Sequence, residues 1–129
     1  MEIKVPYANL NRLNSSCKHT IDANINHCIT NSLFINGPWV EKLEKELEAR
    51  FNASVVGVGS GTAAQQLSLL ALGIGPGDEV LVPSMTFFST AETVSQVGAT
   101  PVFVDCELDY YCIDTQDLES KITSKTRAI

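Results

Sequence analysis

The sequence has 129 residues, is 44% hydrophobic and 19% charged, and carries a formal net charge of −6 at pH 7. This composition is typical of a globular protein with enough apolar residues for one domain's core. The negative charge argues against nucleic-acid binding, which needs clustered Lys and Arg. No apolar run approaches the roughly 20 residues of a membrane span, and no signal peptide is evident. We therefore expect a cytoplasmic protein with neither nucleic acid nor membrane as partner.

The cysteines are dispersed along a chain without a secretory signal, which predicts reduced thiols that serve as small hydrophobic residues. They are Cys17, Cys28, Cys106 and Cys112. No CxxC or HxxxH pair is present, so we expect no metal site.

The first part of the chain predicts an arm and two helices. Residues 1–15 have little periodicity and favour an extended arm. Helical spacing of apolar residues predicts a helix from Ser16 to about Thr30, and Pro38 suits the first turn of a second helix. The second helix has an apolar stripe of Val40, Leu43, Leu47 and Phe51. Its opposite side, with the expected ion pairs Glu41–Lys45 and Glu46–Arg50, indicates a solvated face rather than a binding site.

Strand and helix patterns then alternate along the chain. We predict strands over 54–58, 80–82 and 100–104, and helices over 62–72, ending at Gly73, and 87–97, ending at Gly98. Asp114 or Thr115 should cap a further helix, with Leu118 and Ile122 facing inward. Such alternation favours βαβ crossovers and a parallel, right-handed α/β sheet covered on both faces.

The last five residues, 125–129, are typical of the lead-in to another strand. A sheet edge that ends in mid-strand would expose unpaired backbone groups. We therefore expect the chain to be the N-terminal part of a longer protein.

A glycine-rich turn lies at the centre of the run VVGVGSGTAAQQLSLLA, residues 55–71. A predicted strand, a turn and a helix start follow one another here, an arrangement that presents unpaired backbone N–H groups to an anion. Ser60 and Thr62 add hydroxyl groups at the same place. The pattern predicts a phosphate-binding turn, and we call residues 60–63 the phosphate cup.

Several phosphates fit this turn. Residues 59–64 match the dinucleotide pattern G-x-G-x-x-[GA], with Asp78 at about the right distance. However, Asp78 precedes the strand 80–82, whereas the acidic residue of a dinucleotide site follows its strand. No Lys follows the glycines, which argues against a P-loop. A tight turn that binds nothing remains an alternative.

Phe87 and Phe88 come shortly after the carboxyl end of the strand 80–82, at the edge of an α/β sheet where ligands collect. An aromatic face beside a phosphate site suits a flat, phosphorylated heteroaromatic cofactor. The alternative is that both rings belong to the core. Consecutive residues cannot share one helix face, so we expect at least one of them to point elsewhere.

Several runs together resemble the DegT/DnrJ/EryC1/StrS family: FINGPWVEKLEKELEARF, SGTAAQ, LALGIGPGDEV, PSMTF, PVFVD and IDTQDLESKITSKTRAI. These are pyridoxal-phosphate (PLP) enzymes of the aspartate-aminotransferase fold. The resemblance covers essentially the whole chain. It implies the N-terminal portion of the large domain of fold type I, a mostly parallel sheet flanked by helices and truncated. Residues 1–37 would be an arm and first helix, and residues 38–129 the first part of the PLP-binding domain.

The resemblance also implies roles for individual residues. Gly61, Thr62 and Ala63 would contact the PLP phosphate, Thr62 through its hydroxyl group and the others through their amides, with Ser60 beside them. Phe87 would stack on the pyridine ring. Less certain neighbours of the cofactor are Ser84, Thr86 and Ser89, and the residues implied near the substrate are Ile35, Gly37 and Trp39.

The family's Schiff-base lysine and the aspartate that binds the pyridine nitrogen would lie beyond Ile129. Lys121 and Lys125 do not match that lysine and are expected to be solvated. We therefore expect this chain alone to be inactive. The parent enzyme would be a homodimer that transfers an amino group from an amino acid, usually glutamate, to a nucleotide-linked keto-sugar in deoxyaminosugar or cell-surface polysaccharide biosynthesis. The alternatives are the family's dehydratase branch, a non-catalytic binding fragment and, more distantly, a dinucleotide-dependent oxidoreductase.

Overall fold

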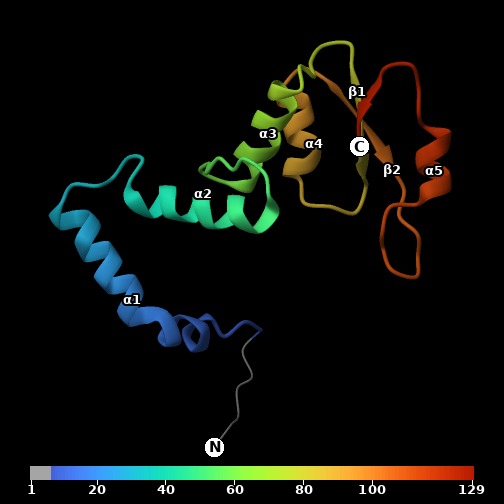
Figure 1. The fold of residues 1–129 in the computed structure, drawn as a ribbon. Helices are drawn as coiled ribbons and strands as arrows, with labels where there is room; N and C mark the ends of the chain where they lie inside the picture. The colour runs from blue at the N-terminus through green and yellow to red at the C-terminus, as the bar shows by residue number, and fades with distance from the viewer. Residues whose placement is uncertain (1–6) are drawn as a thin grey trace, which may run out of the picture. The chain divides into compact units, whose positions relative to one another are not determined.

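The computed structural model describes residues 7–129. The chain forms two compact units, the first ending at Gly57 and the second running from Val58 to Ile129 (Figure 1). The division into residues 1–37 and 38–129 stays a prediction. No helix in the described part of the chain is both long and apolar enough to cross a membrane.

The first helix, α1, covers Leu10–Thr30 and begins earlier than predicted. Asn9 is its N-cap, because its Oδ1 accepts a hydrogen bond from the Arg12 N–H at 3.2 Å. The prediction of an extended arm over residues 1–15 is therefore wrong from Leu10 onward. Residues 1–6 of that predicted arm lie outside the described residues.

The second helix, α2, covers Pro38–Phe51, with Pro38 in its first turn as predicted. The predicted ion pairs of this helix are wrong. Lys42 instead pairs with Glu46 at 3.8 Å, and the Arg50 guanidinium lies 5.8 Å from the centroid of the neighbouring Phe51 ring. Arg50 thus stacks on an aromatic ring rather than turning back to Glu46.

Residues 54–58 do not form the predicted strand. The Val55 N–H donates to Glu48 Oε1 at 3.2 Å, and the Gly57 N–H donates to Glu44 Oε1 at 2.7 Å. Two carboxylates of α2 therefore accept hydrogen bonds from backbone N–H groups that would otherwise donate to a neighbouring strand.

The second unit contains a three-stranded sheet in the order β2-β1-β3. Its strands are β1 (Glu79–Pro83), β2 (Thr100–Val104) and β3 (Thr126–Ala128). β1 is the central strand and pairs in parallel with both neighbours. The predicted parallel sheet is thus confirmed for these strands, and the predicted lead-in at residues 125–129 forms β3.

Three helices accompany the sheet: α3 (Gly61–Ala71), α4 (Ser89–Gln96) and α5 (Thr115–Ser120). α3 and α4 lie side by side (Figure 1). The core cluster consists of Ile74, Val80, Val82, Val94 and Ala99, with Leu69, Ala91, Val97 and Ala128 packed against it. Asp114 caps α5 as predicted. Ile122 lies beyond α5 and is 53% exposed, so its predicted inward orientation is wrong.

The cysteines are all free thiols. Cys17 and Cys112 are exposed, and Cys28 and Cys106 are half-buried. None of them is a fully buried core residue.

Candidate functional site

The phosphate cup forms the first turn of α3. Ser60 is the N-cap in an extended conformation, and its Oγ accepts the Ala63 N–H at 3.1 Å while its carbonyl accepts the Ala64 N–H at 3.0 Å. Within residues 7–129, the N–H groups of Gly61 and Thr62 have no acceptor. These two donors lie at the positive end of the α3 dipole, which is the arrangement that attracts anions.

The two glycines that flank Ser60 have open space where a side chain would stand. A Cβ added to Gly59 or Gly61 would meet no heavy atom within 4 Å. This space leaves room for a ligand beside the first turn of α3. The residues present fit the phosphate of the implied cofactor.

The donors differ in one respect from those that the resemblance implies. The Ala63 amide donates to Ser60 Oγ, so it is not free, whereas the Thr62 amide is. Thr62 is half-buried, and no hydrogen bond of its side chain occurs within the described chain. The cup thus offers the amides of Gly61 and Thr62 together with the Thr62 hydroxyl group.

The two aromatic residues lie in the loop between β1 and α4. The side chain of Phe87 is 78% exposed and that of Phe88 is 76% exposed. The alternative that both rings belong to the core is therefore wrong. The Phe87 carbonyl accepts the Thr90 N–H at 3.0 Å, so the backbone of Phe87 is attached to the first turn of α4.

The cup and the aromatic loop belong to the same compact unit, and a hydrogen bond joins the two helices that follow them. Ser89 Oγ donates to Gln65 Oε1 at 3.2 Å, which joins the start of α4 to α3. Sequence reasoning missed this contact, since no local spacing relates the two residues. Ser89 itself is buried, and its hydroxyl group already has this partner. Of the other implied neighbours, Ser84 and Thr86 are exposed in the loop.

The residues implied near the substrate lie in the first unit. Trp39 is in the first turn of α2 and meets His27 edge-on, with ring centroids 6.1 Å apart. Ile35 is exposed and Gly37 is the N-cap of α2. Trp39 also lines an apolar groove of about 480 Å³ together with Ile21, Asn24, Ile25, Cys28, Ile29 and Phe34. A role for these residues in substrate binding stays a prediction.

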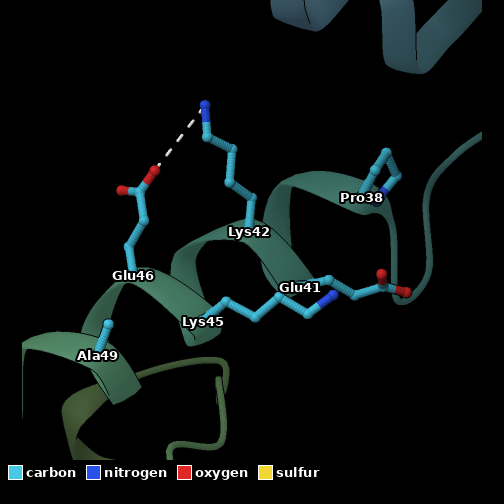
Figure 2. A pocket seen from close by; sticks show the side chains of 6 residues that line it. All are labelled: Pro38, Glu41, Lys42, Lys45, Glu46 and Ala49. Carbon is cyan, nitrogen blue, oxygen red and sulfur yellow. Dashed lines mark ion pairs between the residues drawn. The ribbon is translucent and has the colours of Figure 1, made fainter.

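A second hollow lies on the charged side of α2 (Figure 2). It is lined by Pro38, Glu41, Lys42, Lys45, Glu46 and Ala49. The paired Lys42 and Glu46 side chains remain 65% and 66% exposed, so this hollow is the solvated helix face that the sequence indicates.

Asp78 lies at the amino end of β1, whereas the acidic residue of a dinucleotide site lies at the carboxyl end of its strand. Asp78 precedes the strand and accepts hydrogen bonds from the Gly75 N–H at 3.0 Å and from Arg127 Nε at 3.4 Å. A carboxylate that binds a ribose would have to follow β1, where Ser84 stands. The glycine pattern alone therefore does not support a dinucleotide site.

Lys121 is not the solvated lysine that was predicted. Its Nζ donates to the Phe103 carbonyl at 2.8 Å and pairs with Asp117 Oδ2 at 2.7 Å. The same Asp117 oxygen accepts the Asp105 N–H at 2.7 Å. The Asp105 N–H, and then Lys121, lower the pKa of the Asp117 carboxyl group. Lys121 therefore attaches α5 to β2, and its four-residue spacing from Asp117 was a usable signal.

Comparison with known proteins identifies the family of the chain. The model of the DegT/DnrJ/EryC1/StrS aminotransferase family matches residues 15–129. A UDP-2-acetamido-2-deoxy-3-oxo-D-glucuronate aminotransferase of Pseudomonas aeruginosa is 40% identical over 126 residues, which are 97% of this chain and 35% of that protein.

Solved structures of similar proteins cover nearly all of the chain. An aminotransferase of this family from Brucella abortus superposes with a TM-score of 0.90 at 34% identity, over 98% of this chain and 36% of that one. NtdA from Bacillus subtilis, solved with bound pyridoxamine phosphate (PMP), has a TM-score of 0.89 at 35% identity, over 98% and 30% of the two chains. The chain thus spans about a third of the length of these relatives. The expected fold is confirmed, and the chain belongs to the DegT/DnrJ/EryC1/StrS aminotransferase family.

Proposed function

We propose that this chain is the phosphate-binding part of a PLP-dependent sugar aminotransferase. The observation that carries the proposal is the pair of free N–H groups of Gly61 and Thr62 at the start of α3, together with the open space beside Gly59 and Gly61. PLP supplies the electron sink for amino-group transfer, and the protein supplies binding and orientation. The similar structure of NtdA contains bound PMP, which supports the same cofactor here.

Each residue of the cup has a role in this proposal. The amides of Gly61 and Thr62 and the Thr62 hydroxyl group donate to phosphate oxygens. Ser60 holds the turn in shape through its bond to the Ala63 N–H. We also propose that Ala63 lies beside the phosphate. Its N–H would have to break its hydrogen bond to Ser60 Oγ before it could donate to a phosphate oxygen. Phe87 covers one face of the ring, where offset stacking contributes about 0.5–1.5 kcal/mol.

The substrates and partners are proposed from the family and from the activities of similar proteins. An amino acid, usually glutamate in this family, would donate the amino group. A nucleotide-linked keto-sugar would receive it, as the name of the P. aeruginosa relative indicates for that protein. We further propose a cytoplasmic homodimer, and a Schiff-base lysine outside the 129 residues, without which the chain alone would be inactive.

Binding of PMP tests the cofactor assignment, since PMP needs no Schiff base with a lysine. Equilibrium dialysis should show that PMP binds the protein and that pyridoxamine, which lacks the phosphate, binds far more weakly. NADH serves as the competitor that a dinucleotide site would prefer. Equal binding of PMP and pyridoxamine, or binding of NADH alone, would reject the proposal.

A further inference from the structure

We propose that Gln65 and Ser89 are positioning residues, which set the spacing and orientation of the Phe87 ring relative to the phosphate cup. The inference rests on the proposed function, because it assigns the two residues a role toward the phosphate and ring of one cofactor. Neither residue belongs to the cup or to the aromatic loop itself.

The hydrogen bond between them is buried on one side. Ser89 is the first residue of α4 and is only 6% exposed. Its Oγ–H donates to Gln65 Oε1 at 3.2 Å. Within residues 7–129, Gln65 Oε1 is the acceptor that the buried Ser89 hydroxyl group has. A buried hydroxyl group without an acceptor is costly, so the bond favours the position of α4 in which Ser89 reaches Gln65.

Each end of this bond is joined to one part of the site. Gln65 lies one helical turn after Gly61, so it belongs to the same short helix as the cup. Ser89 lies next to Thr90, whose N–H donates to the Phe87 carbonyl at 3.0 Å and whose Oγ1 is 3.2 Å from Thr86 Oγ1. A shift of α4 along α3 would therefore change the position of Phe87 relative to the cup.

No other hydrogen bond joins α3 to α4 within residues 7–129. Leu69 of α3 and Ala91 of α4 both pack against the core cluster that includes Val94. Apolar contact is not directional and tolerates small sliding movements. A hydrogen bond has a preferred length and angle, and so can fix the relative position of the two helices.

Two ligands separate positioning from general support of the fold. Inorganic phosphate needs only the cup, whereas PMP needs the cup and the Phe87 ring together. Ser89→Ala should weaken PMP binding by about two- to tenfold, the range expected for one net hydrogen bond. It should leave the affinity for inorganic phosphate, measured by competition with PMP in each variant, unchanged.

Gln65→Leu should give the same loss, and it changes an exposed residue, so it serves if Ser89→Ala does not fold. Ser95→Ala is the matched control, because Ser95 is an exposed serine of α4 whose Oγ bonds only within its own helix, to the Ala91 carbonyl at 3.3 Å. Both affinities of this control should equal those of the wild type.

A third change tests whether the effect passes through Phe87. In a Phe87→Ala background the ring is absent, so adding Ser89→Ala should cause no further loss of PMP affinity. Equal losses for PMP and phosphate, no loss for either ligand, or an additive loss in the Phe87→Ala background would overturn the positioning role. A wild-type protein that binds phosphate but gains nothing from the pyridoxamine ring would instead refute the proposed function, and the positioning role with it.

Discussion

Replacement of Thr62 by valine removes one proposed phosphate donor and little else. Valine has nearly the same shape as threonine, keeps the backbone N–H and has a similar helix propensity. Thr62 is half-buried and its hydroxyl group has no hydrogen-bond partner in the described part of the chain. The substitution thus breaks no internal bond, so a loss of PMP affinity would report on the ligand.

The size of the loss follows from the charge of the phosphate. A hydrogen bond to a charged group contributes about 1.5–3 kcal/mol, so Thr62→Val should weaken PMP binding by roughly 10- to 150-fold. Isothermal titration calorimetry measures this, with pyridoxamine as a ligand whose affinity should not change. Thr115→Val, at the exposed start of α5, is the matched control. An unchanged PMP affinity in Thr62→Val would remove this hydroxyl group from the cup.

Three other predictions concern single residues and the free energy of unfolding. Ser60→Ala removes the cap of α3 and should lower the free energy of unfolding by about 1 kcal/mol, measured by urea titration. Leu81→Ala empties a fully buried position in β1 and should cost about 2–5 kcal/mol in the same assay. The folded state lowers the pKa of Asp117, so this carboxylate stabilises the fold above its unfolded pKa of about 3.9 and loses that effect as the pH falls through the folded pKa. Urea titrations below about pH 5 should show this loss in the wild type and a flatter profile in Asp117→Asn, and parallel profiles would contradict it.

Much of the second unit could be predicted from the residue pattern. The apolar runs at 80–82 and 100–104 lie in β1 and β2, and Gly73 and Gly98 follow α3 and α4 with positive φ angles of 72° and 81°. These signals are local, and each is strong by itself. The parallel pairing follows because helices separate the strands.

The first unit was harder to predict because its outcome depends on side chains distant in the sequence. Residues 54–58 have the composition of a strand, but their pattern does not reveal that Glu44 and Glu48 take their backbone donors. The start of α1 was missed because periodicity before Ser16 is weak. The local signal for this start is Asn9, since Asn is a favoured N-cap residue.

The candidate site could likewise be predicted only in part. The glycine-rich turn, and at least one aromatic side chain outside the core after β1, were predicted from residue types and their order along the chain. The choice of Phe87 over Phe88 came from the family resemblance alone. The sequence could not predict whether Ser60 would bind a ligand or cap α3, because a serine hydroxyl group suits both roles. The bond between Gln65 and Ser89 joins residues 24 positions apart, and only the packing of α3 on α4 brings them together.

The amides of Gly61 and Thr62 test the central claim most directly. With 15N-labelled glycine and threonine, the resonances of these two N–H groups can be followed while PMP is added. Hydrogen bonds to the phosphate should shift both resonances downfield, and pyridoxamine should leave them in place. If PMP binds and neither resonance moves, its phosphate lies elsewhere, and the turn before α3 is not the cofactor's phosphate site.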